Sequence, residues 1–286
     1  MTKNNSSRYQ LKLKWLRLKR NKMALMGMVT IVLFFIIGIF GPYIAPYDPL
    51  EEDLGKIQAG ISAENLLGCD QIGRDILSRI IYGCSVTMKI GLISVLMGLF
   101  FGTAIGAIGG YYRGKVDAVC VFFADVLFAF PGLLLALAIV ATIGTGVTGV
   151  IIATGFSSIP QFIRVARSVV LTECQRDYVL AARAIGENDF SIILRYVLPN
   201  CLAPIVVLMM LRIGVIILIA SSLSFLGLGI QPPTPEWGSM LAQGRGYLQV
   251  APHITLFPGL CIMIVVLAFN LFGDGLRDAL DPRMKL

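Results

Sequence analysis

The sequence predicts an all-α polytopic membrane protein with six transmembrane helices. Of its 286 residues, 56% are hydrophobic and 14% are charged, and the mean hydropathy of +0.80 is too high for a soluble globular domain. Only helices or closed barrels satisfy every backbone polar group in hydrocarbon, and the apolar runs have the length of spanning helices. These runs lie near 24–45, 87–110, 116–140, 146–163, 200–226 and 253–273.

The first run follows a basic segment, residues 1–22, and predicts an uncleaved anchor. Its apolar stretch is longer than the core of a typical signal peptide, and no small-residue cleavage site follows it. In the basic segment, Leu11, Trp15 and Leu18 fall on one helical face among lysines and arginines. That pattern is typical of a helix lying in an anionic membrane interface, and the alternative is a disordered basic tail.

The distribution of lysine and arginine predicts the orientation. Basic residues are concentrated at the N-terminus, in the loop after the second run, in segment 164–199 and in the C-terminal tail. By the positive-inside rule both termini and segment 164–199 are cytoplasmic, whereas 46–85 and 227–252 lie outside. The net charge of +7 therefore describes a membrane topology. Because aromatic residues are not interleaved with the basic ones, no nucleic-acid partner is expected.

The outer segment after the first run is acidic and contains a short helical pattern. Its apolar face is formed by Ile72, Ile76, Leu77 and Ile80. On another face Asp75 and Arg79 are spaced i, i+4, which predicts an ion pair between them. Cys69 and Cys84 share the outer side, where a disulfide is an alternative to the plain packing that is more usual for small thiols in a membrane protein.

Polar residues inside the apolar runs are candidates for function, because a charge at mid-bilayer costs about 2.5–3.5 kcal/mol on insertion scales. Asp125 lies in the third run and Arg212 lies about midway along the fifth. Both are candidates for a transport pathway or for helix–helix bonds, either with each other or with separate partners. Asp117, near the cytoplasmic end of its run, is expected to be hydrated, and Asn270 is expected to mark the end of the last helix.

Glycines at four-residue spacing in the second run predict a smooth face for close helix packing. These glycines are Gly98, Gly102, Gly106 and Gly110. The face packs against another helix of this chain or against a partner subunit.

Several kinds of chemistry have no residues to support them. The sequence contains no G-x-x-x-x-G-K-[ST] motif for nucleotide phosphates and a single histidine, His253. A Ser/His/Asp triad or a histidine-rich metal site is therefore not expected. The six cysteines show no metal-ligand spacing either. We expect no metal and no cofactor on this chain and no enzymatic activity of its own.

Residues 177–199 are polar between two apolar runs and predict two short helices at the membrane surface. Asp177 is placed to cap the first helix and Gly186 to end it. The first apolar face is formed by Tyr178, Ala181, Ala182 and Ile185.

A second short helix is predicted directly after the first, with Asn188 or Asp189 placed to cap it. Its apolar face is formed by Phe190, Ile193, Leu194 and Val197. Pro199 is expected to break the backbone before the next run. Such a pair of helices suits docking into a groove of another protein, and an ordinary polar loop is the alternative.

This segment resembles the cytoplasmic motif of ABC importer permeases, which reads Glu-Ala-Ala, three residues, Gly, nine residues, Ile-x-Leu-Pro. The matching positions are Ala181, Ala182, Gly186, Leu198 and Pro199, whereas Leu180 and Tyr196 depart from the motif. The resemblance implies a coupling helix that sits in a cleft of an ATPase subunit. We predict that Asp177, Tyr178 and Arg183 belong to the same contact, with Arg183 reaching an acidic group of the ATPase.

Two further segments resemble the C-type permease of peptide and nickel importers. In the outer segment the matching residues are Leu67, Gly68, Asp70, Gly73, Arg74, Asp75, Ser78 and Arg79. In the C-terminal part they are Trp237, Gly238, Ser239, Pro258, Gly259, Asn270, Gly273, Asp274, Gly275, Arg277, Asp278, Asp281 and Pro282. We expect Trp237 and Arg245, in the proline-rich loop 227–252, to lie near the docking face for a binding protein, and the alternative for Trp237 is an aromatic-belt anchor.

The resemblance implies a type I ABC importer permease fold in the cytoplasmic membrane of a bacterium. The expected organisation is a cytoplasmic segment 1–22, a first transmembrane helix with an extracytoplasmic segment at 23–85, a five-helix core at 86–275 containing coupling loop 164–199, and a cytoplasmic tail at 276–286. The implied partners are a second, B-type permease, two ABC ATPases that use ATP and Mg, and an extracytoplasmic substrate-binding protein. Dipeptides, oligopeptides, glutathione-like peptides and nickel or other metal chelates remain open as substrates. A secondary transporter and a non-transporting membrane scaffold are the alternatives; the former is expected to show inverted repeats.

Overall fold

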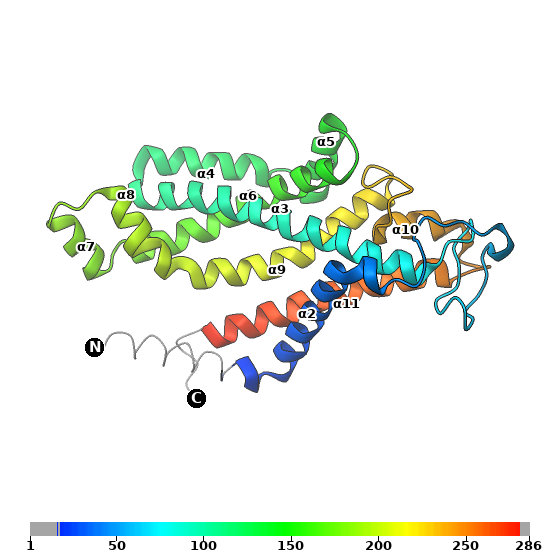
Figure 1. Cartoon of the computed structure of the whole chain (residues 1–286). Coiled ribbons are helices and arrows are strands. Elements are labelled where there is room, and N and C mark those ends of the chain that lie inside the picture. Colours follow the sequence, from blue (N-terminus) through cyan, green and yellow to red (C-terminus); the bar gives the residue numbers. More distant parts are fainter. Residues whose placement is uncertain (1–15, 17, 281–286) are drawn as a thin grey trace.

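The computed structural model describes Leu16 and residues 18–280 of the chain, and these residues form an elongated bundle of helices (Figure 1). No β-strand occurs in this described part. The elements are α2 (Lys22–Ile44), η1 (Leu54–Lys56), α3 (Ile76–Tyr112), α4 (Gly114–Phe128), α5 (Gly132–Ile143), α6 (Val147–Glu173), α7 (Asp177–Ala184), α8 (Asp189–Ile192), η2 (Ile193–Val197), α9 (Leu198–Phe225), α10 (Trp237–Gly244), η3 (Arg245–Tyr247) and α11 (His253–Leu280).

Within the described residues, five helices are long and apolar enough to cross a membrane, and the α4–α5 pair makes a sixth candidate span. The third predicted run is not one helix, because α4 and α5 meet at an angle of 87°. Pro131 lies at this break. Proline disfavours helical geometry at the residue before it and cannot donate a backbone hydrogen bond, so it accounts for the interruption. The fourth run is longer than predicted, because α6 continues to Glu173.

The glycine face of α3 packs against α6, which settles the choice between a partner within the chain and one outside it. A Cβ atom at Gly102 would lie 2.5 Å from the Cβ of Phe162 and 2.6 Å from the carbonyl oxygen of Ile159. One at Gly106 would lie 2.5 Å from the carbonyl oxygen of Ile163. The two backbones therefore approach more closely than any side chain at these glycines would allow.

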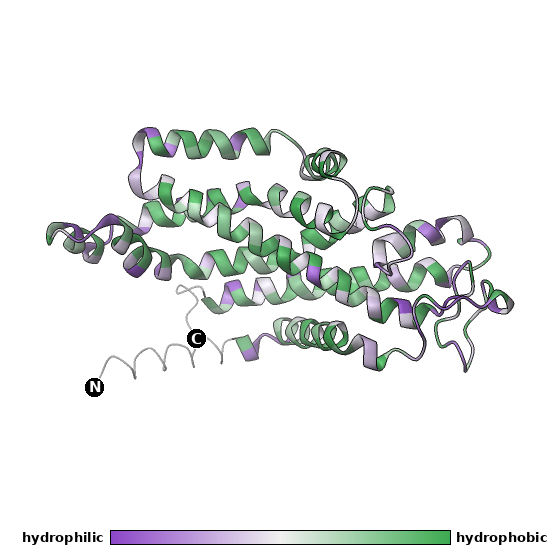
Figure 2. Cartoon of the chain, turned by 45° about the horizontal axis from the view of Figure 1, so that its top comes forward, coloured by the Kyte–Doolittle hydropathy of each residue, from purple (hydrophilic) through white to green (hydrophobic). Residues whose placement is uncertain are grey.

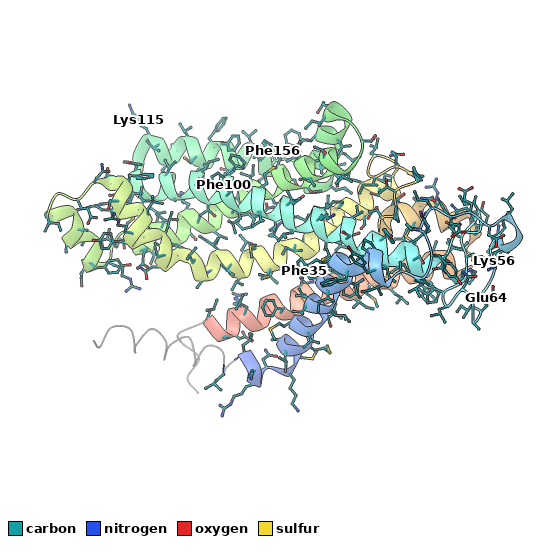
Figure 3. The ribbon with its side chains drawn as sticks, in the orientation of Figure 1. Phe35, Lys56, Glu64, Phe100, Lys115 and Phe156 are labelled. Atoms are coloured by element: carbon teal, nitrogen blue, oxygen red, sulfur yellow. The ribbon has the colours of Figure 1, made fainter. Side chains whose placement is uncertain are left out.

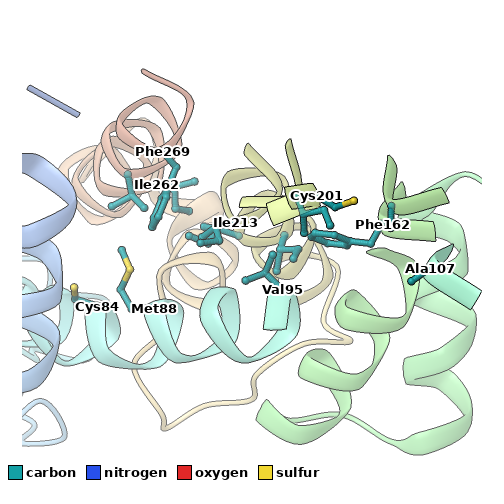
Figure 4. Close-up of a cluster of buried hydrophobic side chains, with 14 of the residues drawn as sticks. Cys84, Met88, Val95, Ala107, Phe162, Cys201, Ile213, Ile262 and Phe269 are labelled. Carbon is teal, nitrogen blue, oxygen red and sulfur yellow. The ribbon is translucent and has the colours of Figure 1, made fainter. Parts of the chain in front are cut away.

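The remaining core lies between α3, α9 and α11, where Val95, Ile213 and Phe269 belong to one buried cluster (Figure 4). Helix α2 crosses α11 at Gly27, whose added Cβ would lie 2.6 Å from the carbonyl oxygen of Ala268.

The prediction that Asn270 marks the end of the last helix is wrong. Helix α11 continues without a break to Leu280.

The polar segments gather at the two ends of the bundle (Figure 2). One end, the α7 end, holds α7, α8, the start of α2 and the end of α11 (Figure 1). Lys115, just after the start of α4, lies at this end, whereas Lys56 and Glu64 lie at the other (Figure 3). We call that other end the α10 end.

At the α10 end, Lys56 Nζ donates to Glu64 Oε2 at 2.9 Å. Because Glu64 accepts this bond and lies beside a positive charge, its carboxyl pKa is lowered.

The predicted i, i+4 ion pair between Asp75 and Arg79 is wrong. Asp75 instead caps α3, accepting a 2.7 Å hydrogen bond from the backbone N–H of Ser78. Arg79 Nε lies 3.5 Å from Asp70 Oδ2, and the same oxygen accepts from Arg74 Nε at 2.7 Å. Helix capping satisfies a backbone donor that would otherwise lack a partner, so it competes with side-chain pairing for Asp75.

Trp237 does not lie at the outer interface, and both roles predicted for it, docking and membrane anchoring, are wrong. Its side chain has 0% exposure. The indole Nε1 donates to the carbonyl oxygen of Ile80 at 3.1 Å, and the ring meets Phe34 edge-on at 5.7 Å between centroids. Trp237 is therefore a core residue that fastens α10 to α3 and α2. Arg245 is exposed, with its guanidinium carbon 5.8 Å from the ring centroid of Phe225.

The residue before Trp237 explains why α10 begins there. Glu236 is buried and accepts hydrogen bonds from the backbone N–H groups of Gly238 and Ser239 at 2.9 and 2.8 Å. Burial raises the pKa of the Glu236 carboxyl, and these hydrogen bonds oppose the rise.

Cys69 and Cys84 are both buried and both free, so the disulfide alternative is not formed. The Sγ atom of Cys84 donates to the carbonyl oxygen of Phe34 at 3.1 Å. In the predicted interfacial helix, Leu11 and Trp15 lie outside the described residues. Leu18 is described and packs against Ala24 and Ala279.

Candidate functional site

The candidate site is the loop between α6 and α9, which contains α7, α8 and η2. Helix α7 begins after Arg176, whose backbone is extended, and no side chain caps it. The prediction that Asp177 is the cap is therefore wrong by one position. Asp177 occupies the first turn and Arg183 the last, where a negative and a positive charge respectively favour the helix dipole. The Tyr178 hydroxyl donates to the Glu173 carboxylate and ties α7 to the end of α6.

Gly186 ends α7 as predicted. Its φ of +79° lies in the left-handed region. The N–H of Glu187 donates to the carbonyl oxygen of Ala182 at 3.1 Å, and the N–H of Gly186 donates to that of Arg183 at 3.0 Å. This pair of bonds is the Schellman arrangement, which satisfies the last carbonyl groups of a helix and reverses the chain.

The second predicted helix is present, and Asn188 caps it. The Asn188 side chain accepts from the N–H of Phe190 at 2.9 Å. Helix α8 runs directly into η2, a single π-helical turn, and then into α9. Pro199 does not break this path, contrary to prediction. It lies in the first turn of α9, directly after the π-helical turn of η2, and the chain is helical on both sides of it.

One side of the loop is part of the core of the bundle. Val179 and Ala182 of α7 are buried, as are Ile192 and Val197, and all four belong to the same cluster as the core of α3 and α9. The predicted common face of α7 is therefore divided. Ala182 faces the chain's own core, whereas Ala181 is exposed.

The other side of the loop exposes large apolar side chains. Ile185 is 81% exposed and Phe190 68% exposed. Tyr178, Leu180 and Leu194 are exposed as well, and we call these five exposed side chains of the loop the exposed loop face. Large apolar side chains left exposed at the end of a bundle are typical of a surface that a protein partner covers.

A polar contact fastens the loop to the end of α3. The Tyr111 hydroxyl donates to Asp189 Oδ1 at 2.6 Å, and Arg183 Nε donates to that hydroxyl at 3.4 Å. The Arg183 guanidinium carbon also lies 4.5 Å from the centroid of the Tyr111 ring. Arg183 thus has a role within the chain that the sequence did not reveal, because Tyr111 lies in a distant part of the sequence.

The intramembrane candidates Asp125 and Arg212 are not paired with each other. Asp125 Oδ1 accepts from Arg164 Nη2 at 2.8 Å. Arg212 Nη2 donates to the hydroxyl of Ser158 at 3.3 Å. Asp117, which was expected to be hydrated, accepts two hydrogen bonds from Arg167. The sequence interpretation placed Arg164 in the cytoplasmic loop, because it ended the fourth run at residue 163.

Among the described residues, no group of three histidine, cysteine, aspartate or glutamate side chains could hold a metal ion. In the described part of the chain, a long helical bundle with five or six membrane-length spans and a two-helix loop at one end is the architecture of a polytopic membrane protein.

The chain belongs to the family of inner-membrane components of binding-protein-dependent transport systems, whose sequence profile matches residues 98–286. A second profile, for the N-terminal transmembrane domain of oligopeptide transport permease C, matches residues 10–63. The chain is thus an ABC importer permease subunit of the peptide and nickel family, as the resemblance implied, and a multi-span inner-membrane protein.

Curated relatives and solved structures agree with this assignment. The glutathione transport system permease protein GsiD of Pectobacterium atrosepticum is 45% identical over 272 residues, covering 95% of this chain and 90% of that protein. GsiD of Escherichia coli O157:H7 is 46% identical over 272 residues, which again cover 95% of this chain and 90% of that protein. A chain of the inward-facing MetNI methionine ABC transporter has the same fold, with a TM-score of 0.58 at 15% identity over 70% of this chain and 94% of that one.

Proposed function

We propose that this chain, together with a second permease, forms the pathway of an ATP-driven importer of peptide-like substrates and receives its driving motion through the exposed loop face. The observation that carries the proposal is the two-sided loop between α6 and α9. Its inner side is buried in the bundle core, and its outer side presents Ile185 and Phe190. A surface displaced by an ATPase would therefore move the membrane helices with it.

The relatives support the proposed substrate class. Proteins 45% and 46% identical over nearly the whole chain are named as glutathione transport permeases. Glutathione is a small peptide, so a peptide-like substrate is the best-supported choice. These relatives offer no support for a nickel or other metal chelate. Family membership likewise favours the importer over the secondary transporter and the scaffold.

The proposed orientation places the α7 end in the cytoplasm. Arg113, Lys115, Arg176 and Arg195 lie in segments near this end, in line with the positive-inside rule. The ATPases, with their ATP and Mg, would then meet the exposed loop face. The binding protein would deliver substrate at the α10 end, where Arg245 remains exposed and available for contact. Trp237 is no longer a docking candidate, because it is buried.

The mechanism that fits this arrangement is alternating access. Closure of the two ATPases on ATP would draw the coupling loops of the two permeases together, and the attached helices would open the pathway outward. Hydrolysis would release the loops and return the pathway to the cytoplasmic side. This chain supplies the helices and the loop, and its partners supply the chemistry.

The test is to replace Ile185 with aspartate in the complete importer. A charge in the centre of an apolar contact should reduce association with the ATPases and substrate-driven ATP hydrolysis by about tenfold or more, because burying an unpaired carboxylate costs several kcal/mol. Ile61→Asp is the matched control, because Ile61 is a similarly exposed isoleucine at the α10 end. Unchanged ATPase association of the Ile185→Asp complex would refute the proposal.

A further inference from the structure

Two ion pairs join α4 to α6 within the apolar part of the bundle. Asp125 is paired with Arg164 at 2.8 Å, and Asp117 is paired with Arg167 at 2.5 Å. The guanidinium carbon of Arg164 also lies 3.9 Å from the centroid of the Phe128 ring. A cavity of about 290 Å³ opens beside the pairs. Its lining residues are Val121, Ala124, Asp125, Ile163, Arg164 and Arg167.

The pair formed by Asp125 and Arg164 lies deep in the span. At 1.5 Å per residue, Asp125 is about 17 Å along α4 from Gly114, and Arg164 is about 14 Å along α6 from Glu173. Both helix ends lie at the α7 end. The hydrocarbon core is about 30 Å thick, so a core that begins at these helix ends would hold both charges near its middle.

The groove between α4 and α6 is unsuited to lipid. The side chains of Asp125 and Arg164 are 53% and 57% exposed in the single chain. Charged side chains at mid-bilayer almost always face protein or a water-filled cavity, because hydrocarbon does not solvate them. The groove on the α9 side of α6, lined by Val165, Val207 and Leu208, is by contrast mainly apolar. The two sides of α6 therefore face different surroundings.

We propose that the groove between α4 and α6 at Asp125 and Arg164 is a water-filled section of the transport pathway that takes zwitterionic peptides. This inference rests on the proposed function and adds a contact site for the substrate. The ammonium group of a peptide is bound by Asp125 and its carboxylate by Arg164, through charge-assisted hydrogen bonds. A guanidinium carries five N–H donors, and Arg164 uses Nη2 for Asp125, so it has donors available for a second carboxylate. Once the peptide has passed, the pair re-forms and leaves no isolated charge in the membrane.

Both signs of charge at one depth favour a substrate that carries both. An isolated aspartate would favour cations and repel carboxylates, whereas an isolated arginine would do the reverse. The paired groups present no net charge, so a zwitterion can exchange with them one group at a time. Phe128, which packs on the face of the Arg164 guanidinium, holds that group in place beside the cavity.

The first test measures water access in the complete importer in proteoliposomes. Asp125→Cys is made in a background in which Cys120 and Cys261, the cysteines that are not buried, are replaced by alanine. The control is Phe122→Cys, on the same helix and 70% exposed in the single chain. A hydrophilic thiol reagent should label position 125 at a rate that changes at least threefold between nucleotide-free and vanadate-trapped complexes. Glutathione delivered by the binding protein should slow it, and position 122 should stay unlabelled. If position 125 is unlabelled in every state of a complex that co-purifies intact, the groove is closed by protein and the proposal is overturned.

The second test measures transport. Asp125→Asn and Arg164→Gln each leave one charge without its partner, so glutathione uptake should fall about tenfold or more in complexes that still assemble. Asp125→Glu keeps the charge and should retain most of the uptake. Parental uptake by both single variants overturns the inference and leaves the proposed function intact. If the parental complex itself neither transports nor responds to the binding protein, the proposed function fails instead.

Discussion

Gly186 offers the sharpest perturbation of the coupling loop. It has a φ of +79° at the end of α7, and an added Cβ would meet no atom within 4 Å. The expectation that Gly186 permits the chain reversal because the position after a helix needs a positive φ is confirmed. The cost of a substitution comes from the backbone conformation alone, because the left-handed region is unfavourable for residues with a Cβ.

The magnitude can be worked out from that conformation. A left-handed residue other than glycine costs about 1–2 kcal/mol, and a β-branched residue such as valine lies at or above the upper end of this range. About 1.4 kcal/mol changes an equilibrium tenfold, so Gly186→Val should lower the ratio of correctly ended to frayed α7 by about 5- to 30-fold. Asparagine tolerates this region, so Gly186→Asn is the matched control and should cost a few tenths of a kcal/mol.

The assay compares the parental complex with the Gly186→Asn and Gly186→Val complexes. Four properties are measured: membrane insertion, assembly with the second permease, ATPase association and uptake. We expect insertion and assembly to be equal in all three, because the substitution touches neither the spans nor their packing. ATPase association and uptake should fall severalfold in the valine variant and remain near parental in the asparagine variant. A valine variant that assembles and transports at the parental rate would show that the loop is an ordinary surface connection.

Three further predictions follow from burial and from the end of the bundle at which a residue lies. Ala182→Leu should destabilise the chain by about 1–3 kcal/mol, because Ala182 is 4% exposed in a packed core. Ala181→Leu, at an exposed position, should leave the melting temperature in detergent unchanged and weaken only ATPase association. Trp237→Ala should cost about 3–5 kcal/mol and lower the yield of folded protein, because the side chain is fully buried; parental thermal stability would contradict this. In intact cells, an impermeant thiol reagent should label a cysteine replacing Glu52 and leave one replacing Arg183 unlabelled, and the reverse pattern would invert the proposed topology.

The spans could be predicted because each depends on a local property, the length of an apolar run. Gly186 and Asn188 could be predicted for the same reason, since helix ends are set by a few neighbouring residues. Pro131 interrupts the third run, but the 87° angle between α4 and α5 depends on how each half packs against other helices. The local sequence pattern does not determine the direction of one helix relative to the next.

Contacts between distant residues were where sequence reasoning failed. An isolated tryptophan in a proline-rich outer loop resembles an interfacial anchor, and nothing nearby indicates that Phe34 and Ile80 enclose it. Asp125 was recognised as unusual from its position, yet its partner Arg164 could not be identified without knowing that α6 extends past residue 163. Both errors concern which helices are neighbours, which periodicity does not determine.

The packing of α3 restricts how the coupling loop can act. Helix α3 runs 37 residues, Ile76–Tyr112, after its cap Asp75, and so reaches from the α10 end to the Tyr111 contact with Asp189 and Arg183. Its glycine face leaves no space against α6, where an added Cβ at Gly102 would lie 2.5 Å from Phe162. Close-packed surfaces of this kind move together rather than slide. A displacement of the exposed loop face would therefore be transmitted to α3 and α6 as a rigid unit, and α6 would carry Arg164 with it. By this route, a movement at the α7 end would reach the ion pair between α4 and α6.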